Sequence, residues 1–134
     1  MKTINVEAKT EKLDEILEIV DAMLFEADCS PKITVPIDIA VEEIFVNIAN
    51  YAYPDKDGEA EVTTYIEDGV FHITFSDSGI PYDPLAHADP DVTLSADERP
   101  IGGLGIYMVK KSMDKVEYKY ENGRNVLTIE KKLI

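Results

Sequence analysis

The sequence predicts an α+β fold, in which most neighbouring strands are joined by short turns rather than by helices. Two amphipathic helical patterns occupy the first half, and two pairs of strands, each joined by a short turn, come later. The length of 134 residues and a hydrophobic content of 45% suit one ordinary domain with a single core. We therefore expect residues 1–134 to form one α+β domain.

The first half of the chain contains a strand pattern followed by two helical patterns. Residues 2–8 alternate apolar and polar side chains, which predicts a strand at the edge of a sheet. Apolar residues then recur at spacings of three and four over 12–24, which predicts an amphipathic helix with an acidic outer face. A second helix is expected from Pro36 or Ile37, because proline suits a first turn, to about Tyr53.

The later strands form two predicted hairpins. Residues 59–67 and 70–77 read as strands joined by an Asp-Gly pair, which favours a tight turn. Residues 115–121 and 125–132 read as a second pair around an Asn-Gly turn.

The chain between the two hairpins is predicted to be a long loop followed by a short helix. Residues 78–100 contain four prolines and no sustained apolar period, and loops of such length in compact domains are often functional. A short helix is expected over 102–113, after a cluster of glycines.

Composition limits the partners of the protein. The sequence contains 13 Lys and Arg and 27 Asp and Glu, which gives a formal net charge of -14, so nucleic acid is an unfavourable partner. Any nucleotide site would need magnesium, helix termini and backbone amides to offset this charge. The sequence has no apolar run long enough to span a membrane and a single cysteine, Cys29, so we expect a soluble cytoplasmic protein.

The second helix carries a polar stripe on a mostly apolar background. Glu43, Asn47 and Asn50 are spaced by four and three residues and therefore share one side of the helix. An asparagine oxygen is a suitable magnesium ligand, and a carboxylate one turn away can orient or deprotonate an attacking hydroxyl. The alternative is that Glu43 and its neighbour Glu42 simply face water.

Asp77 and Gly79 follow an alternating strand. A carboxylate at this place can accept a hydrogen bond from the amino group of adenine, and the glycine lets a flat ring approach the backbone. Asp-Ser-Gly is also a common turn, so this segment alone leaves both interpretations open.

The segment Gly102, Gly103, Leu104 and Gly105 exposes backbone amides at the start of a helix, where phosphate oxygens bind favourably. It is neither a Walker loop nor a dinucleotide fingerprint, because no Gly-Lys-Ser or Gly-Lys-Thr follows and no strand precedes it. His72 and His87 have no evident third ligand, so a zinc site is not expected.

Taken in order, the three segments resemble the ATP-binding domains shared by gyrase, heat-shock chaperones, histidine kinases and DNA mismatch-repair proteins. The likeness is closer to the bacterial anti-sigma factor serine kinases. It rests on AVEEIFVNIANYAY, SDSGIPYDP and GGLGIYMVKKSMDKVEY, and it covers roughly residues 35–133.

This resemblance implies a Bergerat-type fold, a two-layer sandwich of a mixed sheet covered by helices on one face, with residues 78–100 as a lid. It implies ATP and magnesium as ligands. The site residues that it implies are Glu43 as catalytic base, Asn47 as magnesium ligand, Asp77 as adenine acceptor, and Gly79, Gly103 and Gly105 as conformational glycines.

The resemblance further implies a regulator that binds a sigma factor and phosphorylates a serine on a small antagonist protein, with a homodimer as a possible state. An arginine that some members place before the glycine cluster is replaced by Ile101, and Arg99 stands two residues earlier. Two alternatives remain: a non-catalytic module that uses nucleotide only to shape a binding surface, and an acidic α/β domain without a ligand.

Overall fold

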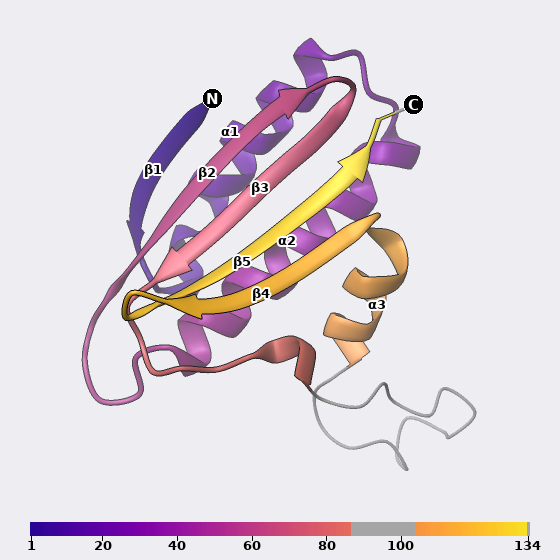
Figure 1. Ribbon diagram of the computed structural model, residues 1–134. Coiled ribbons are helices and arrows are strands. Elements are labelled where there is room, and N and C mark those ends of the chain that lie inside the picture. Colours follow the sequence, from indigo (N-terminus) through magenta and orange to yellow (C-terminus); the bar gives the residue numbers. More distant parts are fainter. Residues whose placement is uncertain (87–103, 134) are drawn as a thin grey trace.

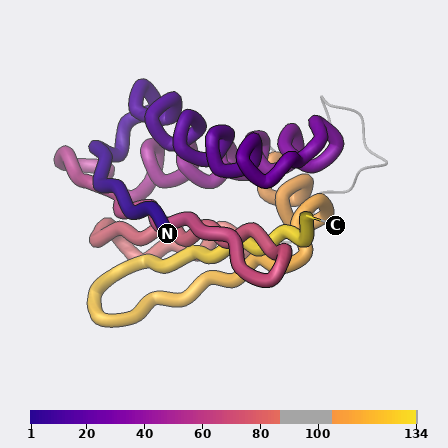
Figure 2. Tube along the Cα trace, turned by 90° about the horizontal axis from the view of Figure 1, so that it is seen from above, coloured from indigo at the N-terminus to yellow at the C-terminus, as the bar shows by residue number. Residues whose placement is uncertain are grey.

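The computed structural model describes residues 1–86 and 104–133, and these form one five-stranded sheet with helices on one face (Figures 1 and 2). The strands run in the order β1-β2-β3-β5-β4 across the sheet. Their bounds, and those of the helices, are β1 Lys2–Glu7, β2 Glu59–Glu67, β3 Val70–Asp77, β4 Lys115–Glu121, β5 Arg124–Lys132, α1 Leu13–Glu26, α2 Pro31–Tyr51 and α3 Leu104–Ser112.

This architecture confirms the α+β class and the two-layer arrangement, and it places β1 at a sheet edge as predicted. The expectation of a mixed sheet was wrong, because all four strand pairs are antiparallel. Two of the pairs, β2 with β3 and β4 with β5, are hairpins, and a two-residue turn can join only antiparallel strands.

Both hairpin turns have the backbone that their sequences predict. Asp68 and Gly69 have φ angles of 52° and 74°, and Asn122 and Gly123 have 54° and 75°. Two successive residues with positive φ define the turn whose twist matches that of the flanking strands.

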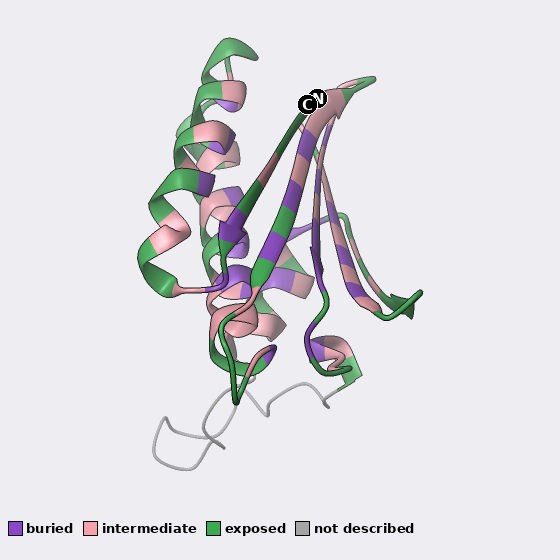
Figure 3. Ribbon diagram, turned by 90° about the vertical axis from the view of Figure 1, so that its left-hand side faces the viewer, coloured by how far each residue is buried: buried purple, intermediate pink, exposed green. Residues whose placement is uncertain are grey.

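The core lies between the sheet and the helices, as the burial colours in Figure 3 show. Phe71, Ile73 and Phe75 on the central strand β3 are at most 1% exposed. The helices contribute a buried set from one face of α1 and one face of α2, which is Ile16, Val20, Leu24, Ile37, Val41, Ile44 and Phe45. In residues 1–86 and 104–133, none of the helices has the length and apolar character that a membrane span requires.

Helix α2 begins earlier than the sequence suggested. Its first residue is Pro31, and Pro36 lies inside it. The carbonyl of Ser30 accepts the amides of Ile33 and Thr34 at 2.9 and 3.0 Å, so the first turn is formed before Pro36 is reached. The amide missing at Pro36 would have bonded the carbonyl of the exposed Lys32, which water can satisfy.

The contact between α1 and α2 contains a pair of carboxyl groups, Asp21 and Asp38. The Oδ1 atom of Asp38 is buried and has no hydrogen-bond partner among the described residues. Burial, together with a hydrogen bond to Asp21 and the charge of Asp21, raises the pKa of Asp38 to about 7. The folded chain therefore holds a proton at Asp38 over a pH range in which the unfolded chain has lost it.

The proton on Asp38 makes the free energy of unfolding depend on pH. Since the pKa of Asp38 is higher in the folded chain, its contribution to stability falls as pH rises from about 4 to 7. We expect Asp38→Asn, which resembles the protonated form, to stabilise the protein relative to wild type at pH 8 and to do so less at pH 5.5. Urea denaturation at the two pH values measures this. Asp14→Asn, an exposed change on α1, is the control, and an equal effect of Asp38→Asn at both pH values would contradict the assignment.

Candidate functional site

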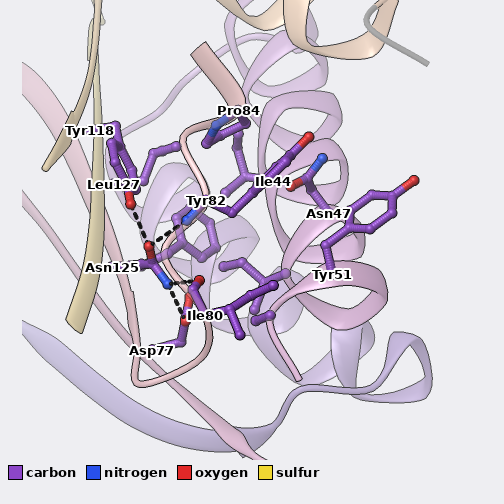
Figure 4. A pocket seen from close by; sticks show the side chains of 13 residues that line it. Ile44, Asn47, Tyr51, Asp77, Ile80, Tyr82, Pro84, Tyr118, Asn125 and Leu127 are labelled. Atoms are coloured by element: carbon purple, nitrogen blue, oxygen red, sulfur yellow. Dashed lines mark hydrogen bonds between the residues drawn. The ribbon is translucent and has the colours of Figure 1, made fainter. Parts of the chain in front are cut away.

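A pocket opens between the C-terminal half of α2 and the ends of β3 and β5 (Figure 4). It encloses about 380 Å³ when space open to solvent is included. Its walls are mostly apolar, with a few polar groups directed inward, as is usual for small-molecule sites. The lining residues are Ile44, Asn47, Ile48, Tyr51, Ala52, Phe75, Asp77, Ile80, Tyr82, Pro84, Tyr118, Asn125 and Leu127.

Asp77, the last residue of β3, is the buried carboxylate of this pocket, with 3% of its surface exposed. Its Oδ1 accepts hydrogen bonds from the backbone amide of Gly79 and from Nδ2 of Asn125, both at 2.9 Å. The described residues supply no donor to Oδ2. The carboxylate is thus held by one oxygen, and the other can meet a ligand in the pocket.

Asn125, near the start of β5, is the centre of the hydrogen-bond network (Figure 4). Its Nδ2 donates to Asp77 and also to the carbonyl of Ile80 at 2.8 Å. Its Oδ1 accepts from the amide of Tyr82 at 3.1 Å and from the hydroxyl of Tyr118. Because all four hydrogen bonds of the side chain are made, the orientation of the amide is fixed.

The loop after β3 rests directly on the end of α2. A side-chain carbon at Gly79 would lie 2.2 Å from the carbonyl oxygen of Ala52, so only glycine fits there. The amide of Ile80 donates to this same carbonyl at 2.9 Å. The glycine therefore couples the position of the loop to the helix that carries Asn47.

Glu43 lies one turn before Asn47 on α2 and contacts the start of α3. A side-chain carbon at Gly105 would lie 1.9 Å from Oε2 of Glu43, so the carboxylate packs against the bare backbone of the glycine. Neither a hydrogen bond nor an ion pair joins Glu43 to another described residue. The first and third sequence segments thus meet at this contact.

Only part of the polar stripe formed by Glu43, Asn47 and Asn50 on α2 lines the pocket. Asn47 lines it, half-buried, and no described residue hydrogen-bonds its amide, so its oxygen is available to a cation. Asn50 is exposed and does not line the pocket. The roles predicted for these residues, and for Glu43, Asp77 and Gly79, remain predictions.

Two aromatic rings stand at the pocket, one from α2 and one from the loop after β3. The centroids of Tyr51 and Tyr82 are 5.7 Å apart, with a tilt of 33° between the ring planes. Flat rings at this place give an aromatic ligand a surface to pack on.

Several predicted positions fall elsewhere. Gly102, Gly103, Arg99 and His87 lie outside the described residues, as does most of the expected lid, and Leu104 is the first residue of α3. His72 is on the opposite face of the sheet, stacked on Tyr65 with ring centroids 4.4 Å apart.

The sequence did not reveal Asn125 or Tyr118. Asn125 opposes Asp77 in the register of β3 and β5, and only this pairing of strands shows that the two are neighbours. Burial, the largest cause, raises the pKa of Tyr118, so its hydroxyl remains a proton donor to Asn125. An asparagine where a strand enters the core is the one signal that the sequence offered.

Comparisons with known proteins identify the family of this chain. The family described as histidine kinase-like ATPase domain matches residues 6–131. The chain is 27% identical over 93 residues to the serine-protein kinase RsbW of Bacillus cereus, a match that covers 66% of this chain and 58% of that relative. It is 30% identical over 96 residues to RsbW of Listeria monocytogenes, which covers 68% of this chain and 61% of the relative.

Solved structures share the fold at low identity. The crystal structure of the RsbU and RsbW domains of Rv1364c from Mycobacterium tuberculosis superposes with a TM-score of 0.64 and 13% identity, covering 99% of this chain and 33% of that one. The catalytic domain of histidine kinase ThkA gives 0.57 and 12%, covering 99% and 98%. These solved structures thus share the two-layer α+β fold of this chain. The chain belongs to the histidine kinase-like ATPase domain family.

The hydrogen-bond network predicts a large effect at Asn125. Asn125→Ala removes the hydrogen bonds that this side chain makes with the buried Asp77 carboxylate, the Ile80 carbonyl and the Tyr82 amide, so we expect a loss of about 2–3 kcal/mol in the free energy of unfolding. Asn5→Ala, an exposed change on β1, should stay within about 0.5 kcal/mol of wild type. Urea denaturation followed by circular dichroism compares them, and equal effects would mean that the network contributes no stability.

Proposed function

We propose that this domain binds magnesium-ATP in the pocket beneath Asp77 and acts as an anti-sigma regulatory factor with protein serine kinase activity. The single observation that carries the proposal is the buried Asp77 carboxylate, held by one oxygen while the other remains available to a ligand. The family membership and the relatives named serine-protein kinase RsbW support it.

In this proposal the adenine ring of ATP enters between the apolar walls of the pocket and the rings of Tyr51 and Tyr82. The available oxygen of Asp77 accepts a hydrogen bond from the amino group of adenine, whereas the carbonyl of guanine at the same position would face a second acceptor. Gly79 lets the loop after β3 lie directly against Ala52, which lines the pocket.

The residues toward the phosphate end have the chemistry that phosphoryl transfer needs. The amide oxygen of Asn47 has no partner among the described residues and fits one position in a magnesium shell. When bound, magnesium neutralises charge on the phosphates. Glu43, half-buried one turn away, accepts the proton of the attacking serine hydroxyl, and the amides of the segment from Gly102 to Gly105 bind phosphate oxygens.

The acceptor in this proposal is a serine of a small antagonist protein, and a sigma factor is the second partner. The relatives supply the kinase part, and the matched segment spans 58% to 61% of their length. The alternative is a non-catalytic module in which nucleotide shapes a protein-binding surface. Glu43 favours the kinase, because its carboxylate has no structural partner among the described side chains.

Calorimetric titration of ATP and GTP tests the nucleotide site. We expect ATP to bind in preference to GTP, and Asp77→Asn to weaken ATP binding roughly tenfold to a hundredfold, because a hydrogen bond to a charged acceptor is lost. Asp55→Asn, an exposed acidic position outside the pocket, removes the same charge and serves as control. Equal affinity for the two nucleotides, or no effect of Asp77→Asn, would refute the proposed orientation of the base.

Glu43→Gln separates the kinase from the binding module. We expect it to lower phosphoryl transfer at least a hundredfold, within the usual contribution of a general base, and to leave ATP affinity nearly unchanged. Glu42→Gln, the exposed neighbour on the same helix, is the matched control. The assay mixes the chain and radiolabelled ATP with small proteins encoded beside its gene. Phosphoryl transfer that survives Glu43→Gln would show that Glu43 is not the general base. ATP binding without phosphoryl transfer to any of these proteins would favour the non-catalytic binding module.

A further inference from the structure

Tyr53, two residues beyond the end of α2, is not one of the described residues that line the pocket, yet it contacts the segment that carries Asp77. Its hydroxyl donates to the backbone carbonyl of Glu59 at 2.7 Å and accepts from the backbone amide of Ser78 at 3.0 Å. The side-chain oxygens of Tyr53 and Ser78 are 3.3 Å apart. One hydroxyl therefore joins the chain after α2, the start of β2 and the first residue after β3.

The ring of Tyr53 is held in place because it packs on Gly58. A side-chain carbon at Gly58 would lie 2.3 Å from Cε1 and Cζ of the ring, so the ring uses space that the glycine leaves open. The carbonyl of Gly58 in turn accepts the amide of Ala8, the first residue after β1, at 2.8 Å. The loop under the ring is thereby tied to the edge of the sheet, and the hydroxyl has a defined position.

The hydroxyl of Tyr53 has one proton, and its oxygen can also accept hydrogen bonds. Because the proton is directed to the carbonyl of Glu59, the oxygen meets Ser78 as an acceptor. Tyr53→Phe would remove this acceptor and keep the ring over Gly58. Ser78 is exposed, so water can then satisfy its amide, but water does not hold the residue in place.

Ser78 lies between the end of β3 and the amide that holds Asp77. The backbone dihedral angles of Ser78 set the direction of the Gly79 amide, which donates to Oδ1 of Asp77 at 2.9 Å. If Ser78 rotates, the Gly79 amide moves away from the carboxylate, and only Asn125 still bonds Oδ1. The direction of the second oxygen of Asp77 is then less well defined.

We propose that Tyr53 is a positioning residue for the choice of nucleotide. Its hydroxyl holds Ser78, so that Gly79 fixes one oxygen of Asp77 and the other oxygen is directed at the ligand. This role rests on the proposed function, in which the second oxygen distinguishes the amino group of adenine from the carbonyl of guanine. Tyr53 acts through the loop after β3 and not by contact with the base.

Loss of the Tyr53 hydroxyl is expected to lower discrimination between nucleotides. A carboxylate that can rotate gains less from the amino group of adenine and repels the carbonyl of guanine less, so ATP binding weakens relative to GTP binding. A general loosening of the pocket would weaken both nucleotides alike. The ratio of the two affinities therefore separates a positioning role from a merely structural one.

Calorimetric titration of ATP and GTP into matched variants tests this role. We expect Tyr53→Phe to lower the ratio of ATP to GTP affinity about threefold to tenfold, the usual effect of one hydrogen bond. Tyr120→Phe, which removes the same hydroxyl from an exposed ring on β4 outside the pocket, should leave the ratio unchanged. Ser78→Ala keeps the backbone amide and should also stay near the wild-type ratio.

Two results of these titrations would overturn the proposal. One is an ATP to GTP ratio in Tyr53→Phe that equals that of wild type, including the case in which both affinities fall equally. The other is a loss of the ratio in Ser78→Ala as large as that in Tyr53→Phe, because the contact would then run through the serine hydroxyl and not through the amide.

Hydrogen exchange measured by NMR without nucleotide tests the positioning of the loop directly. We expect the Gly79 amide to exchange about tenfold faster in Tyr53→Phe than in wild type, and the amides of β3 to exchange at wild-type rates. An unchanged rate at Gly79 would refute the role of Tyr53. A wild-type chain that binds neither nucleotide would refute the proposed function instead, and the exchange rates would still decide whether Tyr53 holds the loop.

Discussion

The hydrogen bond between Asp77 and Asn125 is the interaction on which the functional end of the domain depends. It joins the end of β3 to the start of β5, and Asn125 extends it to the loop at Ile80 and Tyr82 and to the ring of Tyr118. Burying a carboxylate and an amide in an apolar pocket is costly unless their hydrogen bonds are made. The network meets that condition, and it does so without using the second oxygen of Asp77.

The need of buried polar groups for hydrogen bonds also explains why the loop after β3 has a defined position. The loop is tied to Asn125 on one side and to the end of α2 on the other, where Gly79 lies against the carbonyl of Ala52. A change of helix position would therefore move the carboxylate, and a change of loop would move the helix end. Glu43 against Gly105 extends this connection to α3. A ligand that touches any of these elements would affect the others.

The sequence predicted the parts of this arrangement that depend on local rules. Alternation and the Asp-Gly and Asn-Gly pairs gave both hairpins with their turns, because a two-residue turn of positive φ fixes register by itself. Polar residues at spacings of four on an otherwise apolar helix pointed to Glu43 and Asn47. The start of α2 was misplaced, because both Pro31 and Pro36 suit a first turn and the helix begins at Pro31 and continues through Pro36.

What the sequence could not supply depends on contacts between distant segments. Asn125 is 48 residues from Asp77, and the pattern around it marks only the start of a strand. The antiparallel pairing of the strands depends on the path of the connections between them, and local patterns do not specify that path. The expectation of a mixed sheet was therefore wrong. The order of the strands, and the register between strands that no tight turn joins, are properties of the whole chain, so single-segment patterns do not determine them.

The two-residue period of the strands separates the two surfaces of the sheet. Asp77 and Asn125 face the helices, while their immediate neighbours Ser76 and Arg124 face outward and are joined by a hydrogen bond of 2.8 Å. A change at Arg124 therefore acts one residue from the network that holds Asp77. Glu67 and Lys132 lie at the other end of the sheet, beside Val70, so changing them alters the outer face while leaving the pocket undisturbed. This separation along the strands means that the outer face beside Val70 can be changed independently of the pocket.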